Sequence, residues 1–321
     1  MMKLGVIGMS EGNAHPYSWS AIVNGSFDGA EISKVGYPAV TAYLDANKDT
    51  LGINSARVTH VWTQNRGISE SIARTAVIDH IADKLEDMIG QVDAILLCRD
   101  DPENHVSMAK PFIDAGIPIF IDKPLASTSE DLQYFSDEVR KGKFIMSCSS
   151  QRYANECRIA KQEIANFGKL ELVTAVGKKD WIKYGVHILE GIFSLLNDPI
   201  ATSVKHIGKD QKDIVHVEFE NGMQAVIHLF MDITPTFQIS LFGQKGWRLI
   251  EIKNSYSMFR DNLIEFIRSV EEGKSRLAFD KTENIIRTLI AAKDSLHTGG
   301  KTIDLSKHKQ SGNSRIASNS L

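Results

Sequence analysis

The sequence predicts an α/β protein in which a doubly wound parallel sheet is followed by an α+β domain with a mixed, largely antiparallel sheet. In the first half, short apolar runs alternate with helical patterns. In the second half, β-type runs follow one another, separated by turn-forming residues. The 321-residue length is about twice that of a usual single domain. We therefore expect one domain over residues 1–150, a second over residues 151–304, and a polar tail over residues 305–321.

The first half opens with an apolar strand at residues 3–8 and a helix that begins near Ser18. The segment 24–56 is rich in Gly, Asp, Asn and Pro, which indicates an insertion before the next strand. Val92–Cys98 is almost wholly apolar, as expected of a parallel strand that is buried on both faces. Further strands are predicted at residues 57–62, 92–98, 117–121 and 144–149. Further helices are predicted at residues 69–78, 85–89, 106–115 and 130–141.

The second half contains β-type runs separated by turns such as Glu220-Asn221-Gly222, a pattern typical of antiparallel strands. These strands are predicted at residues 170–176, 213–219, 223–230, 237–242 and 247–252. Three helices are expected to cover one face of the resulting sheet, at residues 184–196, 261–271 and 282–295. The serine-rich tail has no apolar period, which predicts disorder.

The composition argues against several classes of partner. The net charge is −3 and the isoelectric point is near 6.4, so a basic nucleic-acid-binding surface is not expected. No apolar run approaches the ~18 residues that a membrane span requires. The three cysteines, Cys98, Cys148 and Cys157, lack metal-ligand spacing, and the N-terminus lacks the features of a signal peptide. We therefore expect a cytoplasmic protein with a small-molecule substrate and neither a nucleic-acid nor a membrane partner.

A glycine-containing turn joins the first strand to the first helix. Such a turn lets the backbone approach a pyrophosphate held at a helix N-terminus, so it predicts a dinucleotide-binding, or Rossmann, domain. The candidate contacts are Gly8, Met9, Ser10 and Gly12. In the GxGxxG frame that starts at Gly8, Ser10 and Asn13 replace the second and third glycines, so an ordinary tight turn remains an alternative.

The residue that binds the adenosine ribose is usually an acid at the end of the second strand. Here that position falls in Thr63–Arg66, which contains no carboxylate. Asp28 and Glu31 lie at the usual sequence distance but outside any predicted strand. Thr63 and Arg66 are candidate cofactor contacts, Arg66 toward a 2′-phosphate, although a lone exposed arginine is more often a solvated surface charge. The cofactor is expected to be NAD or NADP, with the choice left open.

Two strand ends in the first half carry a specific pattern, in Val92–His105 and in Gly116–Ala126. They resemble the glucose–fructose oxidoreductase / inositol dehydrogenase family, in which one strand leads into a Pro-containing loop with a later His and the next ends in Glu-Lys-Pro. Here Asp replaces the Glu. The lysine of this motif follows a parallel strand, where open α/β sheets bind ligands, although a surface lysine is the alternative. The resemblance implies four residues near the cofactor: Asp101, His105, Asp122 and Lys123.

The resemblance continues into the second half. Ser150–Tyr153, Phe167–Lys169 and Tyr184–Glu190 are similar to the family's segments, the last to its Asp-x-Gly-x-His-x-x-Asp helix. His187 matches the family's histidine, whereas Lys183 stands where the family has an aspartate. Helical spacing places His187, Glu190 and Ser194 on one polar face of an otherwise apolar helix, which indicates a ligand-facing surface or a solvated one.

The resemblance implies an NAD(P)-dependent oxidoreductase that acts on a secondary alcohol or ketone of a sugar, inositol or related compound. It assigns general acid–base catalysis to His187 and polarisation of the substrate oxygen to Lys123. Glu190 would orient the helix face. The expected substrate contacts are Lys123, Arg152, Asp180, Lys183, Tyr184 and His187. The family further implies a homodimer or homotetramer formed through the open face of the second sheet.

Two alternatives remain at the level of sequence. Ser10, the missing ribose carboxylate, Asp100-Asp101 and Lys183 all fit a non-catalytic or regulatory protein that keeps the fold and its cofactor. Lys123, Lys183 and Arg152 together fit a dehydrogenase with an anionic substrate. The remaining histidines show no metal-ligand spacing and neither a GxSxG nor a P-loop motif occurs, so no metal, serine hydrolysis or nucleoside triphosphate chemistry is expected.

Overall fold

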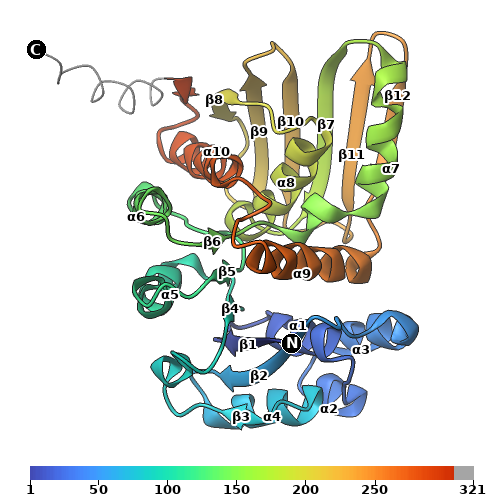
Figure 1. The fold of residues 1–321 in the computed structure, drawn as a ribbon. Helices are drawn as coiled ribbons and strands as arrows, with labels where there is room; N and C mark the ends of the chain where they lie inside the picture. The colour runs from blue at the N-terminus through green and yellow to red at the C-terminus, as the bar shows by residue number, and fades with distance from the viewer. Residues whose placement is uncertain (307–321) are drawn as a thin grey trace, which may run out of the picture.

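The first half of the chain folds around a six-stranded sheet. The structure is a computed structural model, and it describes residues 1–306 (Figure 1). All neighbouring strands of this sheet are parallel, in the order β3-β2-β1-β4-β5-β6, so the predicted doubly wound sheet is confirmed. The strands are β1 (Met2–Ile7), β2 (Ala56–Trp62), β3 (His80–Ile81), β4 (Ala94–Leu97), β5 (Ile119–Ile121) and β6 (Ile145–Met146).

Helices cover both faces of this sheet, because its strands are apolar on both sides. They are α1 (His15–Asn24), α2 (Gly29–Lys34), α3 (Pro38–Asp45), α4 (Arg66–Ala76), α5 (His105–Asp114) and α6 (Ser129–Arg140). The predicted insertion contains α2 and α3, two short helices that the Gly- and Asp-rich composition concealed; Asp28 caps the first and Pro38 begins the second. The helix predicted at residues 85–89 is a 3₁₀ turn, Leu85–Met88.

The second half forms a seven-stranded mixed sheet in the order β12-β11-β7-β10-β9-β8-β13. Only the β7–β10 pair is parallel, so the largely antiparallel sheet is confirmed. Its strands are β7 (Leu170–Lys178), β8 (Ala201–His206), β9 (Lys212–Phe219), β10 (Gln224–Phe230), β11 (Phe237–Gly243), β12 (Trp247–Glu251) and β13 (Ile303–Asp304). The sequence did not predict β8, which is short and largely polar, or the two-residue β13.

One face of this second sheet is covered by α7 (Asn155–Glu163), α8 (Val186–Leu195) and α10 (Phe279–His297) (Figure 1). Ile188, Leu189 and Ile192 of α8 pack into a core that also contains Ile227 and Leu229 of β10. A single π-helical turn, Trp181–Gly185, immediately precedes α8. A helical layer on one face is therefore confirmed, but its membership was predicted wrongly in part: α7 was not predicted, and the helix expected at residues 261–271 packs on the first sheet instead.

The helix α9 (Ser255–Glu271) belongs to the second half of the sequence but packs on the first sheet. Its residues Leu263, Phe266 and Ile267 lie in the same buried cluster as residues of α1, α3, β1 and β2. Phe266 meets Phe120 of β5 edge to face, with ring centroids 5.6 Å apart. The boundary at residue 150 stays a prediction, and the placement of α9 is a feature that it did not include.

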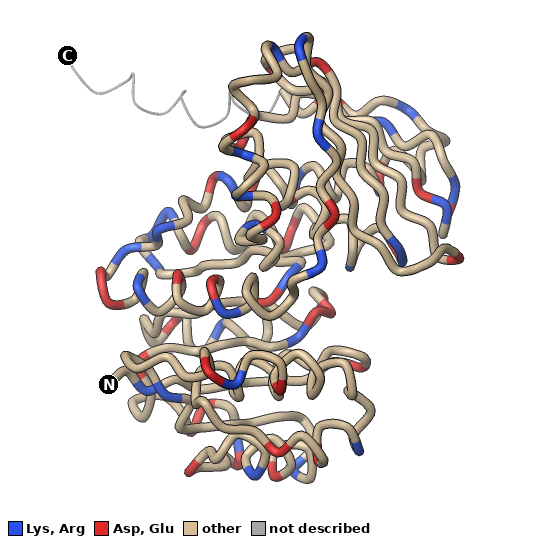
Figure 2. Tube along the Cα trace, turned by 90° about the vertical axis from the view of Figure 1, so that its right-hand side faces the viewer, with Lys and Arg blue, Asp and Glu red and all other residues tan. Residues whose placement is uncertain are grey.

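Charges of both signs are interspersed along the two halves of the chain, without a stripe of one sign (Figure 2). This distribution agrees with the small net charge. Among the described residues, no helix is both long and apolar enough to cross a membrane. Of the predicted tail, residues 307–321 lie outside the described part of the chain.

Candidate functional site

The ends of β4 and β5 place two acidic residues and a lysine next to one another. Parallel neighbours end at the same edge of a sheet, so Asp100 after β4 lies beside Lys123 after β5. Lys123 is only 5% exposed, and its Nζ is 3.5 Å from Oδ2 of Asp100. The predicted surface-lysine alternative is therefore wrong: Lys123 is a buried cation at the ligand-binding edge of the sheet.

Asp122 is fully enclosed by polar partners from the start of α1. Its Oδ2 accepts a hydrogen bond from Nδ2 of Asn13 at 2.9 Å and lies 2.5 Å from Nδ1 of His15. Burial alone would raise the pKa of Asp122, but the charges of His15 and Lys123 and the two hydrogen bonds hold that pKa at about 2. The carboxylate thus remains ionised. Sequence reasoning missed Asn13 and His15, because nothing along the chain links them to the end of β5.

His187 lies at the start of α8 with one ring nitrogen engaged. Its Nδ1 is 2.6 Å from Oγ of Ser149, and its ring meets Tyr184 and Phe237 at centroid distances of 5.3 and 5.9 Å. Burial, and next the charge of Lys123, lower the pKa of His187 well below its usual value. The imidazole is therefore neutral at pH 7 and able to accept a proton.

Behind His187, a buried ion pair fixes Ser149. The Ser149 N–H donates to Glu190 Oε1 at 3.2 Å, and Arg152 Nε donates to Glu190 Oε2 at 2.6 Å. Arg152 also donates to Asp198 at 2.8 Å. Burial raises the pKa of Glu190 and Arg152 opposes that rise. Glu190 and Arg152 thus position Ser149, which in turn contacts His187.

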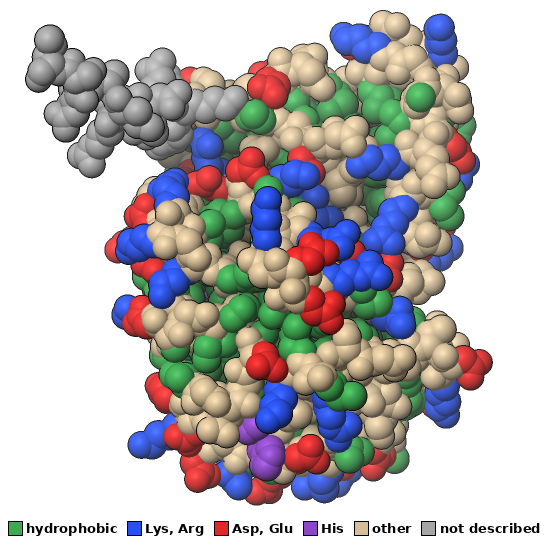
Figure 3. Space-filling view, in the orientation of Figure 1, with side chains coloured by type: hydrophobic (Ala, Val, Ile, Leu, Met, Phe, Trp, Pro, Cys, Tyr) green, Lys and Arg blue, Asp and Glu red, His purple; other side chains and the backbone are tan. Residues whose placement is uncertain are grey.

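Arg152 is a predicted substrate contact that the structure brings to a different place. It lines a pocket of about 390 Å³ between α7, the end of α8 and the start of α10. Lys123, Lys183 and His187 do not line this pocket. Charged side chains of both signs gather on this face of the molecule (Figure 3). The predicted contact of Arg152 with substrate stays a prediction, and its observed partners are carboxylates of the protein.

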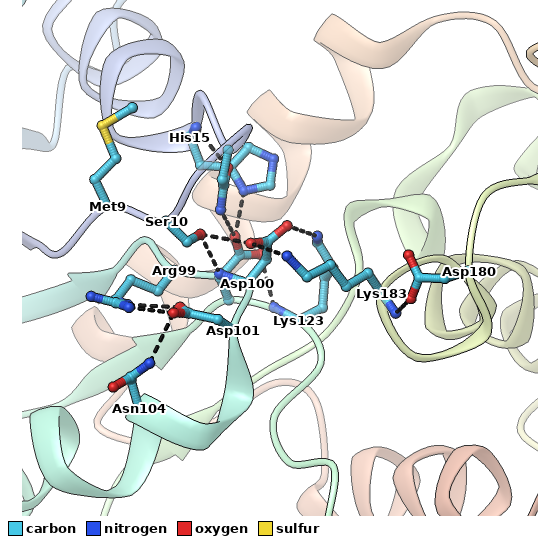
Figure 4. A network of polar contacts seen from close by, with 12 residues as sticks. Met9, Ser10, His15, Arg99, Asp100, Asp101, Asn104, Lys123, Asp180 and Lys183 are labelled. Carbon is cyan, nitrogen blue, oxygen red and sulfur yellow. Dashed lines mark hydrogen bonds and ion pairs between the residues drawn. The ribbon is translucent and has the colours of Figure 1, made fainter. Parts of the chain in front are cut away.

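Asp100 connects the two halves of the site (Figure 4). Its Oδ1 accepts a hydrogen bond from Oγ of Ser10 at 2.6 Å, and its own N–H donates to the same hydroxyl at 3.1 Å. Nζ of Lys183, from the π-helical turn of the second half, is 3.5 Å from Oδ1. The Lys183 side chain therefore points toward Asp100, while 37% of it is exposed.

The other predicted substrate contacts border the same place. Asp180 caps the π-helical turn, since its Oδ1 accepts the N–H of Lys183 at 2.9 Å. The Tyr184 ring stacks on Phe237, with centroids 6.2 Å apart, and Nζ of Lys179 lies 4.3 Å from the centre of the Tyr184 ring. Sequence reasoning missed Lys179 and Phe237, which lies on a strand of the second sheet.

The turn after β1 fits a pyrophosphate. Gly8 and Gly12 adopt positive φ angles of 78° and 75°, and a side chain at Gly12 would meet nothing within 4 Å. Within residues 1–306, the N–H groups of Glu11 and Gly12 have no hydrogen-bond partner, and the first turn of α1 contains no acidic residue. Free backbone donors at a helix N-terminus are the usual binding groups for a phosphate. Met9, by contrast, is tied through its N–H and C=O to Gln64.

At the end of β2, the described residues offer no carboxylate for a ribose. Thr63 donates to the backbone of Asn65 at 2.7 Å, and Arg66 forms ion pairs with Asp83 and Glu70. The two acids nearest in sequence are also engaged elsewhere: Asp28 caps α2, and Glu31 accepts from Ser71. Arg66 is therefore an exposed side chain that already forms two ion pairs. The end of β2 does not distinguish NAD from NADP.

The loop after β4 is held by Asp101 and His105. His105 is fully buried, and its two ring nitrogens lie 3.0 and 2.9 Å from the backbone oxygens of Leu125 and Arg99. Asp101 pairs with Arg99 and accepts from Asn104. In the structure both side chains stabilise the loop that carries Asp100, and their predicted contact with a cofactor stays a prediction.

Comparison with known proteins follows the same division of the chain. Residues 27–149 match a family described as "Oxidoreductase family, NAD-binding Rossmann fold". Over 109 residues, the chain is 34% identical to inositol 2-dehydrogenase 1 of Saccharopolyspora erythraea. That similarity spans 32% of this chain and 32% of the relative, so it covers about a third of either protein.

Solved structures resemble nearly the whole chain. A probable dehydrogenase of Thermotoga maritima has a TM-score of 0.75 at 14% identity, over 95% of this chain and 99% of the other. A myo-inositol dehydrogenase of Lactobacillus casei, crystallised with NAD(H) and myo-inositol, has a TM-score of 0.74 at 15% identity, over 95% and 97% of the two chains. At these identities the likeness shows the fold alone: this chain has the same two-domain fold as those proteins.

Proposed function

We propose that the chain is an NAD(P)-dependent dehydrogenase or reductase of the oxidoreductase family with an NAD-binding Rossmann fold, whose model matches residues 27–149. Its substrate is a secondary alcohol or ketone of a sugar, inositol or related compound. The observation that carries the proposal is the convergence of Lys123 and His187 from different halves of the chain: Lys123 is buried after β5 beside Asp100, His187 begins α8 with Nδ1 on Ser149, and after burial it is the charge of Lys123 that most lowers the pKa of His187.

The two side chains divide the chemistry between them. A bound nicotinamide supplies the acceptor or donor of the hydride. For oxidation, the neutral imidazole of His187 takes the hydroxyl proton; because Ser149 occupies Nδ1, Nε2 is the atom left for this step. The ammonium of Lys123 stabilises the alkoxide character that develops on the same oxygen. Reduction of a ketone uses the same groups, with His187 returning the proton.

We expect the protein to bind a nicotinamide dinucleotide through the turn that contains Gly8, Ser10 and Gly12. Calorimetric titration with NAD(H) and NADP(H) should give heat with at least one of them, and Gly12→Asp should weaken that binding at least ~10-fold because a carboxylate would face the phosphates. Gly116→Asp is the matched control, since Gly116 also has a positive φ and open space. Absence of heat and of thermal stabilisation with either cofactor would contradict the enzymatic and the regulatory readings together.

The rate of alcohol oxidation should persist into mildly acidic solution. The neutral form of His187 is the base, and its pKa is lowered, so protonation switches the base off only well below pH 6.5. In a profile of kcat against pH, we expect no acidic fall between pH 7.5 and about 6. A midpoint at or above 6.5 would mean that His187 is solvated or is not the base.

The open face of the second sheet supports the proposed homodimer or homotetramer. Trp247, Leu249 and Phe242 are 66%, 49% and 38% exposed, and they lie on the face opposite the helical layer. Exposed aromatic and aliphatic side chains of this kind mark contact surfaces. A reducing, cytoplasmic setting fits the three cysteines, all of which are free and buried.

A further inference from the structure

Two positions at which the sequence departs from the family's pattern meet at one carboxylate. Ser10 replaces a glycine and Lys183 replaces an aspartate, and both contact Oδ1 of Asp100, at 2.6 and 3.5 Å. Oδ2 of the same residue is 3.5 Å from Nζ of Lys123 (Figure 4). One carboxylate therefore joins the nucleotide-binding turn, the lysine after β5 and the turn before α8.

The neighbouring charged groups make closer contacts with other residues. Asp122 contacts His15 and Asn13, and Arg99 is paired with Asp101. Asp180, the nearest acid along the chain to Lys183, accepts the backbone N–H of Lys183 through Oδ1. Among the described residues, Asp100 is the one salt-bridge partner of both Lys123 and Lys183.

Two ammonium groups thus share one ion-pair partner. The side chain of Lys123 is 6% exposed and that of Asp100 is 11% exposed, whereas 37% of the Lys183 side chain is open to solvent. Charge interactions around the nearly buried pair are stronger than at the surface, and the exposed part of Lys183 leaves it accessible to a ligand. A ligand carboxylate near Lys183 would give this ammonium group an ion-pair partner of its own.

Resting on the proposed function, we propose that Asp100, anchored by Ser10, determines the substrate class: it holds Lys123 and Lys183 beside one shared carboxylate, so that the site selects a sugar-like substrate bearing a carboxylate of its own. Lys183 makes the contact with that carboxylate, and Asp100 sets its strength without touching the reacting atoms.

The test uses matched pairs of sugars that differ in one carboxylate. Protein loaded with NADH is titrated with D-glucose and D-glucuronate, and with D-galactose and D-galacturonate, while the NADH fluorescence is recorded. For the wild type, at least one acid should bind at least ~10-fold more tightly than its neutral partner. Lys183→Met should abolish that preference, and Lys205→Met, a removal of charge on β8, should leave it unchanged.

Asp100→Asn should change the affinity for the acidic sugar in the opposite direction to Lys183→Met, which distinguishes this inference from a merely structural role of Asp100. Removing the shared counter-ion should tighten binding of the acid by about tenfold and leave the neutral sugar unchanged. Asp100→Glu should restore the wild-type ratio. Acids that bind no better than neutral sugars, or an Asp100→Asn variant that binds the acid more weakly, would overturn the inference while NADH binding and the proposed function stand. Failure of the wild type to bind NADH would contradict both this inference and the proposed function.

Discussion

Lys123→Ala and His187→Ala should each lower kcat by at least ~10²-fold, because alkoxide stabilisation and proton transfer each contribute on that scale. The measurement is steady-state turnover of whichever sugar or inositol the wild type oxidises, with NAD or NADP. The affinity for cofactor should change little, since Gly8 and Gly12 form the proposed phosphate-binding turn.

Two controls keep this result interpretable. Circular dichroism and thermal unfolding should show that both variants remain folded, and His187→Gln serves where alanine leaves too large a gap. Lys205→Ala removes a lysine on β8 and should turn over at the wild-type rate. Wild-type turnover in both Lys123→Ala and His187→Ala would show that the site has been assigned wrongly.

Arg152→Ala should destabilise the protein by about 3–5 kcal/mol, the usual cost of removing one partner from a buried ion pair. Its side chain is 8% exposed and pairs with Glu190 and Asp198, which are 1% and 10% exposed, so the variant would leave buried negative charge without its main partner. Urea unfolding measures the loss. It should be larger at pH 8 than at pH 5, because the pKa of Glu190 is already raised and protonation removes the uncompensated charge.

Arg158→Ala is the matched control, because Arg158 pairs with Asp261 on the surface and such pairs contribute at most about 1 kcal/mol. Stability and KM of the Arg152→Ala variant together distinguish the two roles proposed for Arg152. A variant with the stability of the wild type and a raised KM would assign Arg152 to the substrate, as the resemblance implied. Lower stability with a folded, active enzyme would assign it to the support of Ser149 and His187.

The alternation of strands and helices in the first half was predictable because parallel strands carry their own signal. Val92–Cys98 is apolar apart from Asp93, because the strand within it, β4 (Ala94–Leu97), is buried on both faces. The two-residue β13 has no such signal: it exists because Ile303 pairs with Val204, about a hundred residues away. Pairing of that kind depends on the completed fold.

The site likewise contains residues with a local sequence pattern and residues without one. Lys123 and His187 follow recognisable local patterns, and the sequence predicted both. The sequence could not identify His15 as a site residue, because its contact with Asp122 joins residues 107 positions apart. Asp100 was visible only as an acid near the expected pyrophosphate path. That it pairs with Lys123 and Lys183 depends on how β4, β5 and the turn before α8 converge in space.

The position of α9 has a consequence for how the protein folds. The helix contacts both halves of the chain: the Tyr256 hydroxyl accepts a hydrogen bond from that of Thr50 at 3.0 Å, and Nδ2 of Asn262 donates to Oγ of Ser150 at the junction of the halves. Phe266 packs against Phe120, and both rings are buried. A ribosome that has released only the first 150 residues has therefore made a sheet whose apolar cover is still unsynthesised. We therefore expect the first domain to complete its apolar cover only after the chain has passed residue 271, which couples the folding of the two halves.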